Sequence, residues 1–583
     1  MDTNRLKRFA QYARRELLQT VTTKLEMVLD KESAARREKP RAIEDLEKAI
    51  KELGKERVID QVAYTWFNRF CALRFMDVKG YNRIRVVSPL EDQFQPEILA
   101  EAKMGHLGDE VVSEKLRERI LALLAGTFSS RDPQTEAYRL LIVAICNEYH
   151  RSMPFLFERI DDYTELLMPD DLLSGNSILA YTREAMTPEN CESVEVIGWL
   201  YQFYISEKKE DVFKQLKKGK KIGSESIPAA TQLFTPSWIV RYLVENSLGR
   251  LWMLNRPQSK LVEKMEYYIL PEQVETDFLR VSSPGELKVC DPACGSGHML
   301  VYAFDLLYAI YEEEGYEPLE IPEKILTDNL YGIEIDKRAG ELAAFALVMK
   351  ARERYRRFLR KPVQPNIAVL EPIAFEEGEL SAYLDFVGRD LFTTALLETL
   401  HQFKEADNFG ALIRPVVTDV AGMLGILKNK DAAGQLLLYK THEKVLQVLK
   451  QADYLSPKYQ VVIANPPYMG NKGMNPRLSV FAKDNYPDTK SDLFEMFIER
   501  NLELVQKNGY SAMVTMEAWM FLCSYEKLRT KLLNVSTMIS MVHMPYLGKG
   551  GTSMGINFGT SATIFHNASD PQFKGHFCCV RYF

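Results

Sequence analysis

The sequence predicts an α/β fold that follows a long all-helical domain. Residues 1 to about 220 carry apolar side chains at three- and four-residue steps, as amphipathic helices do, with almost no strand-like alternation. Further along, short apolar runs are followed at once by glycine, proline or acidic residues, at 286–297, 330–336 and 459–468. Because ligands bind at the carboxyl ends of strands in open α/β sheets, these three stretches form the candidate functional site.

The length requires more than one domain. A chain of 583 residues is too long for a single hydrophobic core, since domains usually hold roughly 150 residues. We expect a helical amino-terminal domain over residues 1–222, with a basic linker at its end, and an α/β domain over residues 223–583. Helical spacing and several charges from about 395 to 455 predict a helical insertion in the second domain.

The most informative stretch is the tetrapeptide Asn465-Pro466-Pro467-Tyr468, which follows the β-branched run 459–464. The prolines end the strand and remove two backbone donors, so the carbonyls before them stay free to accept hydrogen bonds. Asn465 adds a side-chain acceptor, and Tyr468 adds a flat face on which a planar base can stack. The group suits a planar NH2-bearing substrate whose nitrogen attacks an electrophile. Taken alone, the four residues fit an ordinary proline turn equally well.

A strand, turn and helix are predicted upstream of this motif. Residues 286–290 lead into a turn, and an apolar helix pattern begins at His298; the turn consists of Asp291, Pro292, Ala293, Cys294, Gly295, Ser296 and Gly297. The two glycines let the backbone approach a nucleotide-like ligand closely. A dinucleotide fingerprint needs a third glycine where this chain has Leu300, so a nicotinamide cofactor is disfavoured.

Two further stretches extend this site. Before the apolar helix pattern that starts near residue 238, we expect Thr235 at the N-cap and Pro236 at the first helical position. Residues 330–336 predict the next strand, which ends in acid and can accept hydrogen bonds from both hydroxyls of a ribose. The acid lies well beyond the usual spacing of about twenty residues, which predicts an inserted helix around residues 322–326.

The charge distribution leaves two interpretations open. The net charge is −6, yet seven lysines lie between Lys208 and Lys221. This run is either a flexible solvated linker or a clamp on nucleic-acid phosphates, with its contacts from Lys217, Lys218, Lys220 and Lys221.

Membrane and metal chemistry are both disfavoured. No window approaches the ~18 apolar residues of a membrane span, and the start lacks a signal-peptide core, so we expect a cytoplasmic protein. The eight cysteines include no Cys-x-x-Cys pair. Cys290, Cys294 and His298 are spaced by four, but a turn separates them, so we expect no metal site.

Together these motifs resemble the S-adenosylmethionine-dependent amino-methyltransferases. Their order, with the glycine loop before Asn-Pro-Pro-Tyr, resembles the γ arrangement of the N6-adenine DNA methyltransferases. Residues 64–69, 198–209, 229–236 and 490–494 are similar to the PglX (BrxX) family, the adenine-specific DNA methyltransferases of BREX phage-defence systems. The likeness runs from near residue 1 to the end of the chain. It implies a Rossmann-like methyltransferase core with S-adenosyl-L-methionine as cofactor.

The resemblance also implies roles for single residues. It implies that Glu334, rather than Asp336, holds the ribose of the cofactor. The remaining cofactor contacts that it implies are Gln232, Phe234, Thr235 and Pro236 at the methionine end, then Asp291, Pro292, Ala293, Cys294, Gly295, Gly297 and Asn465. The acid that normally faces the adenine ring stays open, since residues 366–371 have the right place but an irregular pattern.

For the target, the resemblance implies an adenine turned out of double-stranded DNA, because a duplex hides N6 in the major groove. The Asn465 side chain and the Pro466 carbonyl would accept the two N6 protons. Stacking on Tyr468 at roughly 1–3 kcal/mol would offset part of the cost of turning the base out. Trp519 or Phe521 could form the opposite wall.

Three other functions stay open. The same tetrapeptide occurs in enzymes that methylate ribosomal RNA bases or a glutamine of release factors, so an RNA or protein substrate is an alternative. A third alternative is a cofactor-binding scaffold that is inactive alone and works with other BREX defence proteins. Members of the family continue with a C-terminal target-recognition region, which we expect to be absent here, so the DNA recognition sequence is not readable.

Overall fold

The computed structural model describes residues 1–581 except 109–111, 161, 273, 389–392, 431–435, 457, 547 and 549–555. The chain divides into two compact units, residues 1–207 with 352–364 and residues 208–351 with 365–583. The division therefore comes earlier than the expected boundary after residue 222. One reason is that residues 220–223 pair with the second unit, where the Ile222 N–H donates to the Gly473 carbonyl at 3.0 Å.

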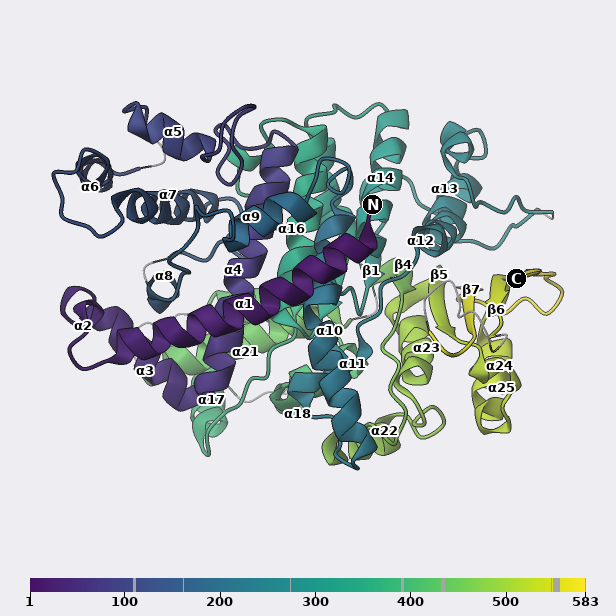
Figure 1. Cartoon of the computed structure of the whole chain (residues 1–583). Helices are drawn as coiled ribbons and strands as arrows, with labels where there is room; N and C mark the ends of the chain where they lie inside the picture. The colour runs from purple at the N-terminus through teal and green to yellow at the C-terminus, as the bar shows by residue number, and fades with distance from the viewer. Residues whose placement is uncertain are drawn as a thin grey trace. The chain divides into compact units, whose positions relative to one another are not determined.

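The first unit is built of helices, and its described residues contain no strand (Figure 1). Apolar residues at helical spacing bury one face of the first helix, and the fourth helix is buried on nearly all sides in its second half. Trp66 is fully buried and stacks on Phe70, so these two aromatic rings of α4 belong to the core of this unit. The helices are α1 (Thr3–Leu29), α2 (Ala34–Glu38), α3 (Pro40–Leu53), α4 (Lys55–Val78), α5 (Glu97–Lys103), α6 (Glu114–Leu124), α7 (Pro133–Tyr149), α8 (Tyr163–Leu166), α9 (Ile178–Ala185) and α10 (Glu195–Lys217).

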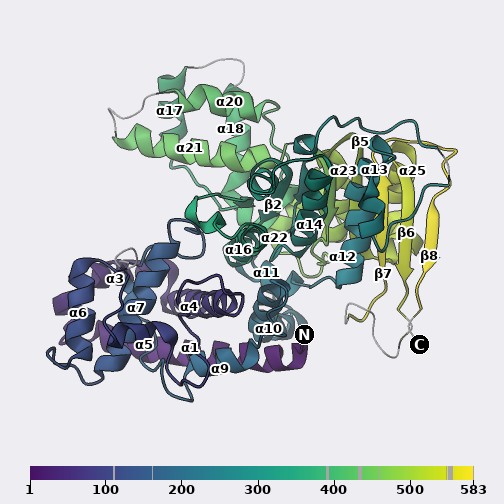
Figure 2. The same ribbon diagram turned by 90° about the horizontal axis from the view of Figure 1, so that it is seen from above.

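One sheet organises the second unit, and Figure 2 shows its last strands, β6, β7 and β8, in yellow. Its strands are β1 (Val289–Asp291), β2 (Leu330–Glu334), β3 (Asn366–Val369), β4 (Tyr459–Ala464), β5 (Val505–Met516), β6 (Thr537–Met544), β7 (Thr560–His566) and β8 (His576–Cys579). Over the described residues their order is β3-β2-β1-β4-β5-β7-β6-β8. β1 to β5 pair in parallel, and β7 lies antiparallel between β5 and β6.

This strand order fixes the place of a ligand site. The chain moves outward from β1 to β3 and then returns to β4 on the other side of β1. The order therefore reverses between β1 and β4, and the crevice outside their carboxyl ends is where such sheets bind ligands. The predicted Rossmann-like α/β core is confirmed.

Helices surround the sheet, with α14 against β1 and β2, and α23 against β4 and β5. The helices of this unit are α11 (Ile227–Thr231), α12 (Ser237–Val244), α13 (Arg250–Asn255), α14 (His298–Glu313), α15 (Ile321–Lys324), α16 (Lys337–Arg354), α17 (Glu379–Val387), α18 (Thr393–Gln402), α19 (Ala406–Phe409), α20 (Val420–Lys428), α21 (Leu436–Tyr454), α22 (Pro476–Asn485), α23 (Leu493–Leu504), α24 (Ala518–Phe521) and α25 (Glu526–Val535). In the described part of the chain, none of the helices has the length and apolar content that crossing a membrane requires.

Two predicted insertions are present as helices. α15 and the π-helical turn η5 (Ile325–Asn329) occupy the place of the helix expected around residues 322–326. Helices α17 to α21 lie between β3 and β4, so helical structure starts near residue 379 rather than 395. Their buried residues, among them Leu400 and Val448, share one hydrophobic core with Tyr459 and Val462 of β4. The insertion is therefore packed onto the strand that precedes the Asn-Pro-Pro-Tyr motif.

Candidate active site

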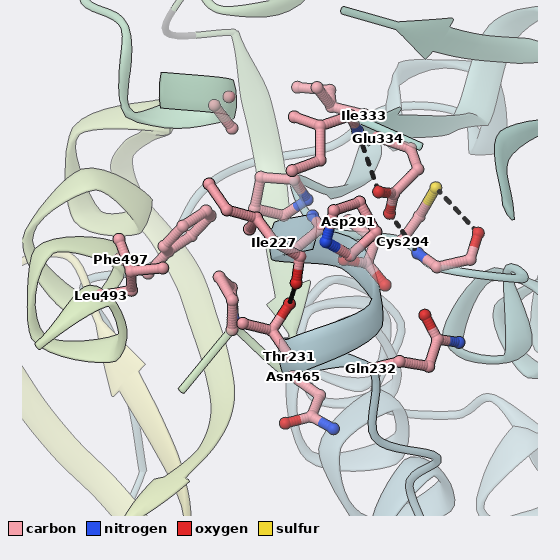
Figure 3. Close-up of a pocket in the computed structure, with 18 of the residues that line it drawn as sticks. Ile227, Thr231, Gln232, Asp291, Cys294, Ile333, Glu334, Asn465, Leu493 and Phe497 are labelled. Atoms are coloured by element: carbon pink, nitrogen blue, oxygen red, sulfur yellow. Dashed lines mark hydrogen bonds between the residues drawn. The ribbon is translucent and has the colours of Figure 1, made fainter. Parts of the chain in front are cut away.

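A cavity lies at the carboxyl ends of β1, β2 and β4 and encloses about 930 Å³, its open mouth included. Figure 3 shows Asp291, Cys294 and Glu334 on one side of it and Leu493 and Phe497 on the other. The predicted site residues that line the cavity are Gln232, Phe234, Asp291, Pro292, Ala293, Cys294, Gly295, Glu334, Asn465 and Pro467.

Glycine is needed at two positions of the β1 loop for different structural reasons. Gly295 has a φ of +54°, and a Cβ there would meet nothing within 4 Å, so the backbone faces open space at the cavity. Gly297 has a φ of +83° and does not line the cavity. A Cβ on Gly297 would lie 2.9 Å from the Cβ of Ala343. Gly297, the N-cap of α14, is therefore required for the close approach of the β1 loop to Ala343 of α16 rather than for direct contact with a ligand.

Backbone donors hold Glu334 at the end of β2. Its Oε2 accepts from the Gly295 N–H at 2.8 Å, and its Oε1 accepts from the N–H groups of Ile335 at 2.9 Å and Asp336 at 3.0 Å. Burial raises the pKa of Glu334 to about 7, and the backbone donors oppose this shift. Oε1 thus accepts two hydrogen bonds and Oε2 accepts one, so Oε2 keeps acceptor capacity for one further donor, such as a ribose hydroxyl.

Asp291 is the acid at the end of β1. It is 1% exposed, and its Oδ1 accepts from the Ala293 N–H at 3.1 Å. Burial raises the pKa of this carboxyl to about 8, with a smaller contribution from the nearby Glu334. The single local hydrogen bond indicates that Asp291 shapes the turn of the β1 loop.

The Asn465 amide has a fixed orientation at the end of β4. Its Nδ2 donates to the Leu233 carbonyl at 3.2 Å and to the Thr235 hydroxyl at 3.0 Å. Both amide protons are thus used, so Oδ1 points the other way. The Tyr468 hydroxyl lies 2.8 Å from Oδ1 and 2.9 Å from the Val514 carbonyl, and it has one proton to share between them.

The prediction that Thr235 caps the following helix is wrong. The N-cap of α12 is Pro236, with ψ 139°, and no side chain caps this helix. Thr235 is fully buried, and its hydroxyl accepts from Asn465 instead. Thr235 and Pro236 do not themselves line the cavity.

The segment before Thr235 is held from two sides. The Lys209 ammonium donates to the Gln232 carbonyl at 2.7 Å, and burial lowers the pKa of this lysine. The Phe234 ring stacks on His298, with ring centroids 4.6 Å apart. Burial lowers the pKa of His298 to about 4, and its Nε2 has no hydrogen-bond partner among the described residues. His298 thus lines the cavity as a neutral imidazole, and its Nε2 is buried.

Tyr468 belongs to an aromatic group beside the cavity, and neither it nor the buried Pro466 lines it. Its ring meets Phe494 and Phe558 edge to face, with centroids 6.1 Å and 5.5 Å away. Phe558 was missed at the level of sequence, since one phenylalanine beside a glycine-rich stretch gives no signal. The antiparallel pairing of β7 could have found it, because Met516 at the end of β5 pairs with Thr560 at the start of β7.

The two aromatic residues predicted to face Tyr468 lie in different environments. Trp519 is 4% exposed, packs near Phe565 in a hydrophobic core, and donates its indole N–H to the Ser561 hydroxyl at 3.2 Å. A base cannot stack on a ring that is this deeply buried, so the prediction that Trp519 stacks on the target base is wrong. Phe521 is 64% exposed and lies beside His543, so its stacking role stays a prediction.

The basic run is not a flexible linker over residues 208–217, because these form the last part of α10. Lys217, Lys218 and Lys220 are exposed. Lys221 donates to the carbonyl of Lys472 at 2.9 Å, in the loop that follows the Asn-Pro-Pro-Tyr motif. The exposed lysines therefore lie near the side of the unit that holds this motif.

No group of three or more His, Cys, Asp or Glu residues in the described ranges has the geometry to hold a metal ion. Cys290 and Cys294 are both buried, and burial raises the pKa of each thiol.

Two protein-family models match parts of this chain. Residues 328–547 match the model of the Eco57I restriction-modification methylase family, and residues 280–366 match that of the MmeI DNA-methyltransferase domain. Among solved structures, the chain aligns over its full length with 59% of the MmeI chain in a complex with DNA, at 12% identity and a TM-score of 0.44.

Two curated relatives match almost the whole chain. An adenine-specific methyltransferase, BrxX, of Escherichia coli O9:H4 is 38% identical over 98% of the chain. The chain resembles the BrxX and PglX methyltransferases. The PglX of Lacticaseibacillus casei is 32% identical over 93% of the chain. The chain spans about half the length of these BrxX and PglX relatives, 51% and 49% respectively. The predicted resemblance is confirmed.

Proposed function

We propose that this chain transfers a methyl group from S-adenosyl-L-methionine to N6 of an adenine in double-stranded DNA. The observation that carries the proposal is the Asn465 amide. Its two protons are held by Leu233 and Thr235, and Asn465 lines the same cavity as Gly295 and Glu334. The adenine-specific activity in the names of the BrxX and PglX relatives supports adenine as the target.

The residues present fit S-adenosyl-L-methionine. The Oε2 of Glu334 has acceptor capacity left for a ribose hydroxyl, and the open space at Gly295 allows close approach to the backbone. The stacked rings of Phe234 and His298 add a flat apolar surface to the lining of the cavity. When bound, this cofactor supplies an electrophilic methyl group.

The chain's own part in the reaction is to position the nucleophile. The N6 lone pair of adenine is delocalised into the ring, so N6 is a poor nucleophile. The Asn465 Oδ1 and the Pro466 carbonyl would each accept a hydrogen bond from one of the two N6–H groups. These hydrogen bonds would direct the N6 lone pair out of the ring plane. When the Tyr468 hydroxyl donates to Val514, both lone pairs of Oδ1 are available to the substrate. Positioning and charge stabilisation of this kind need no strong base.

The target adenine has to leave the duplex to reach this site. Tyr468 and Phe558 lie edge to face, and we propose that one of these rings moves to stack on the extruded base. Phe558 replaces Trp519 in this role. The exposed Lys217, Lys218 and Lys220 would contact phosphates of the same DNA.

The decisive experiment uses Asn465→Ala with tritiated cofactor and double-stranded DNA, RNA or a glutamine-containing peptide. We expect the wild type to label DNA, and Asn465→Ala to lose about 100-fold or more in rate, as when one stabilising hydrogen bond of a reaction is removed. Calorimetry should show cofactor affinity within about threefold of wild type. Asn429→Ala, at the exposed C-cap of α20, is the matched control. Unchanged transfer by Asn465→Ala, or labelling of RNA or peptide alone, would contradict the proposal.

We further propose that the methylation marks host DNA in a BREX phage-defence system with partner proteins, which the resemblance to BrxX and PglX supports. Long-read sequencing of DNA from cells that express the protein with and without its genomic neighbours tests this. N6-methyladenine at one sequence motif that depends on the neighbours is the expected result. Modification of random adenines, or of none in either strain, would reject the role.

A further inference from the structure

The cavity has a second wall that the sequence did not indicate. Besides the strand ends, it is lined by residues 408–412 of the helical insertion and by Leu493 and Phe497 of α23. Among the described lining residues, none comes from residues 366–371, the stretch in the expected place for an acid that faces the adenine of the cofactor. The adenine end of the cavity is therefore built from a different part of the chain.

The acid that follows β3 is turned toward the insertion. The Glu371 N–H donates to the Gln451 side chain at 3.2 Å, and its Oε2 accepts from the Gln447 side chain at 3.1 Å. Both glutamines belong to α21. Glu371 thus has partners away from the cavity, and it is not among the residues that line it.

The segment 408–412 is held firmly in place through its carbonyl groups. The Tyr486 hydroxyl donates to the Leu412 carbonyl at 2.7 Å. Arg500, which is 3% exposed, donates to the carbonyls of Ala411 at 3.0 Å and Ile413 at 2.9 Å. Because these donors are buried and come from α23 and the end of α22, the segment forms a fixed wall.

The same segment lies next to the ribose position. Gly410 has a φ of +58°, and a Cβ on it would lie 3.0 Å from Cγ2 of Ile335. Ile335 directly follows Glu334, the acid proposed to hold the ribose. A ring attached to that ribose would meet Ile335, Leu412 and Phe497, which are apolar.

We infer that residues 408–412 and Ile335 hold the adenine ring of S-adenosyl-L-methionine by apolar contact, with no carboxylate facing its amino group. The inference rests on the proposed function, since it needs this cofactor in this cavity. The described acids that line the cavity, Asp291 and Glu334, lie at the ends of β1 and β2. Recognition by shape should tolerate a change of the ring's exocyclic group.

The first test uses the wild-type chain and two ligands. Calorimetry compares S-adenosyl-L-homocysteine with S-inosyl-L-homocysteine, in which an oxygen replaces the amino group. We expect the inosyl ligand to bind less than about tenfold more weakly. A loss above about 100-fold would overturn the inference, because sites built to hydrogen-bond a group reject ligands that lack it by large factors.

The second test uses truncations in the insertion. Leu412→Ala should weaken S-adenosyl-L-homocysteine about tenfold, whereas Leu424→Ala, an equally apolar buried site on α20 away from the cavity, should change the affinity less than twofold. Ile335→Ala, at a half-buried position, gives a second variant if Leu412→Ala fails to fold. Glu371→Gln should leave the affinity unchanged.

The outcomes separate the two proposals. A tenfold loss in Glu371→Gln with no loss in Leu412→Ala and Ile335→Ala overturns the adenine site and leaves the proposed function standing. If the wild type binds neither ligand, both proposals fail.

Discussion

Asn465 takes its orientation from residues far away in the sequence. The Thr235 hydroxyl that accepts its amide proton lies 230 residues earlier and is fully buried. A buried amide proton without a partner costs about 1–3 kcal/mol, so this hydroxyl restricts the amide to one of its two flipped states. Thr235 is thus a positioning residue for Asn465, in addition to its expected place near the cofactor.

We predict that Thr235→Val lowers kcat about 10- to 100-fold, because the amide loses an acceptor and its orientation. The Kd for S-adenosyl-L-homocysteine should stay within about threefold. Thr235→Ser, which keeps the hydroxyl, should retain most of kcat. Steady-state methyl transfer to DNA and calorimetry measure both quantities. Thr530→Val, at an exposed position on α25, controls for the general effect of the substitution. Equal losses in the Val and Ser variants would argue against this positioning role.

The raised pKa of Glu334 predicts that cofactor binding depends on pH. Burial raises its pKa to about 7, so the free folded protein carries a proton on this acid below that pH. Accepting a ribose hydroxyl alongside three backbone donors requires the carboxylate form, so the Kd for S-adenosyl-L-homocysteine should rise up to tenfold per pH unit below pH 7 and level off above it. Calorimetry from pH 5.5 to 8.5 measures this. Glu334→Gln should bind weakly at every pH, and a flat wild-type profile would refute the assignment.

The raised pKa of Glu334 also makes the free energy of unfolding depend on pH. Raising the pH strengthens cofactor binding but lowers the stability of the chain without cofactor. The folded chain without cofactor binds the Glu334 proton more tightly than the unfolded chain, whose acid titrates near pH ~4.3. The free energy of unfolding should therefore be highest below about pH 4.3 with respect to this group and fall as the pH rises to about 7. Asp291, with its pKa raised by burial to about 8, contributes in the same direction.

At the scale of elements, the β1 loop approaches α16 closely at Gly297, the N-cap of α14. Gly297 combines a left-handed φ of +83° with a distance of only 2.9 Å from a built Cβ to the Cβ of Ala343. Gly315, at the end of α14, has a similar φ of +79° but open space around it. Substituting alanine at each of these two glycines therefore separates the cost of a left-handed backbone from the cost of crowding against Ala343.

We predict that Gly297→Ala lowers the free energy of unfolding by about 2–4 kcal/mol, from left-handed strain of about 1–2 kcal/mol plus overpacking against α16. Gly315→Ala should lose only the strain, about 1–2 kcal/mol. Urea denaturation followed by circular dichroism measures both. Equal losses in the two variants would show that the contact with Ala343 does not limit the packing of these helices.

The sequence predicted the secondary-structure elements better than it predicted the hydrogen-bond partners of single side chains. β4 occupies residues 459–464 as expected, because a β-branched run bounded by prolines depends on local properties alone. Thr235 and Trp519 were misread, because the Asn465 amide and the Ser561 hydroxyl that engage them are distant in sequence. The wall at 408–412 was missed for the same reason, since its position depends on Arg500 and Tyr486. Propensity and spacing carry no information on such pairings.

At the scale of the whole molecule, every residue proposed to hold the cofactor belongs to the unit of residues 208–351 and 365–583. A ligand that binds one folded unit stabilises that unit by RT ln(1 + [L]/Kd), which is about 2.7 kcal/mol at 100 times the Kd. None of the described residues of the helical unit, 1–207 and 352–364, is among those that line the cavity. Ligand binding should therefore act on the two units unequally.

We predict that S-adenosyl-L-homocysteine at 100 times its Kd slows amide hydrogen exchange at residues 232–235, 291–297, 332–336 and 408–412, and leaves helices α1 to α9 unchanged within error. Hydrogen exchange with mass spectrometry measures both units in one sample. Glu334→Ala at the same ligand concentration is the control, and its protection should largely vanish, because the carboxylate that anchors the ribose is missing. Equal protection in α1 to α9 would show that the helical unit takes part in binding. Protection that spares 408–412 would instead separate the insertion from the cofactor site.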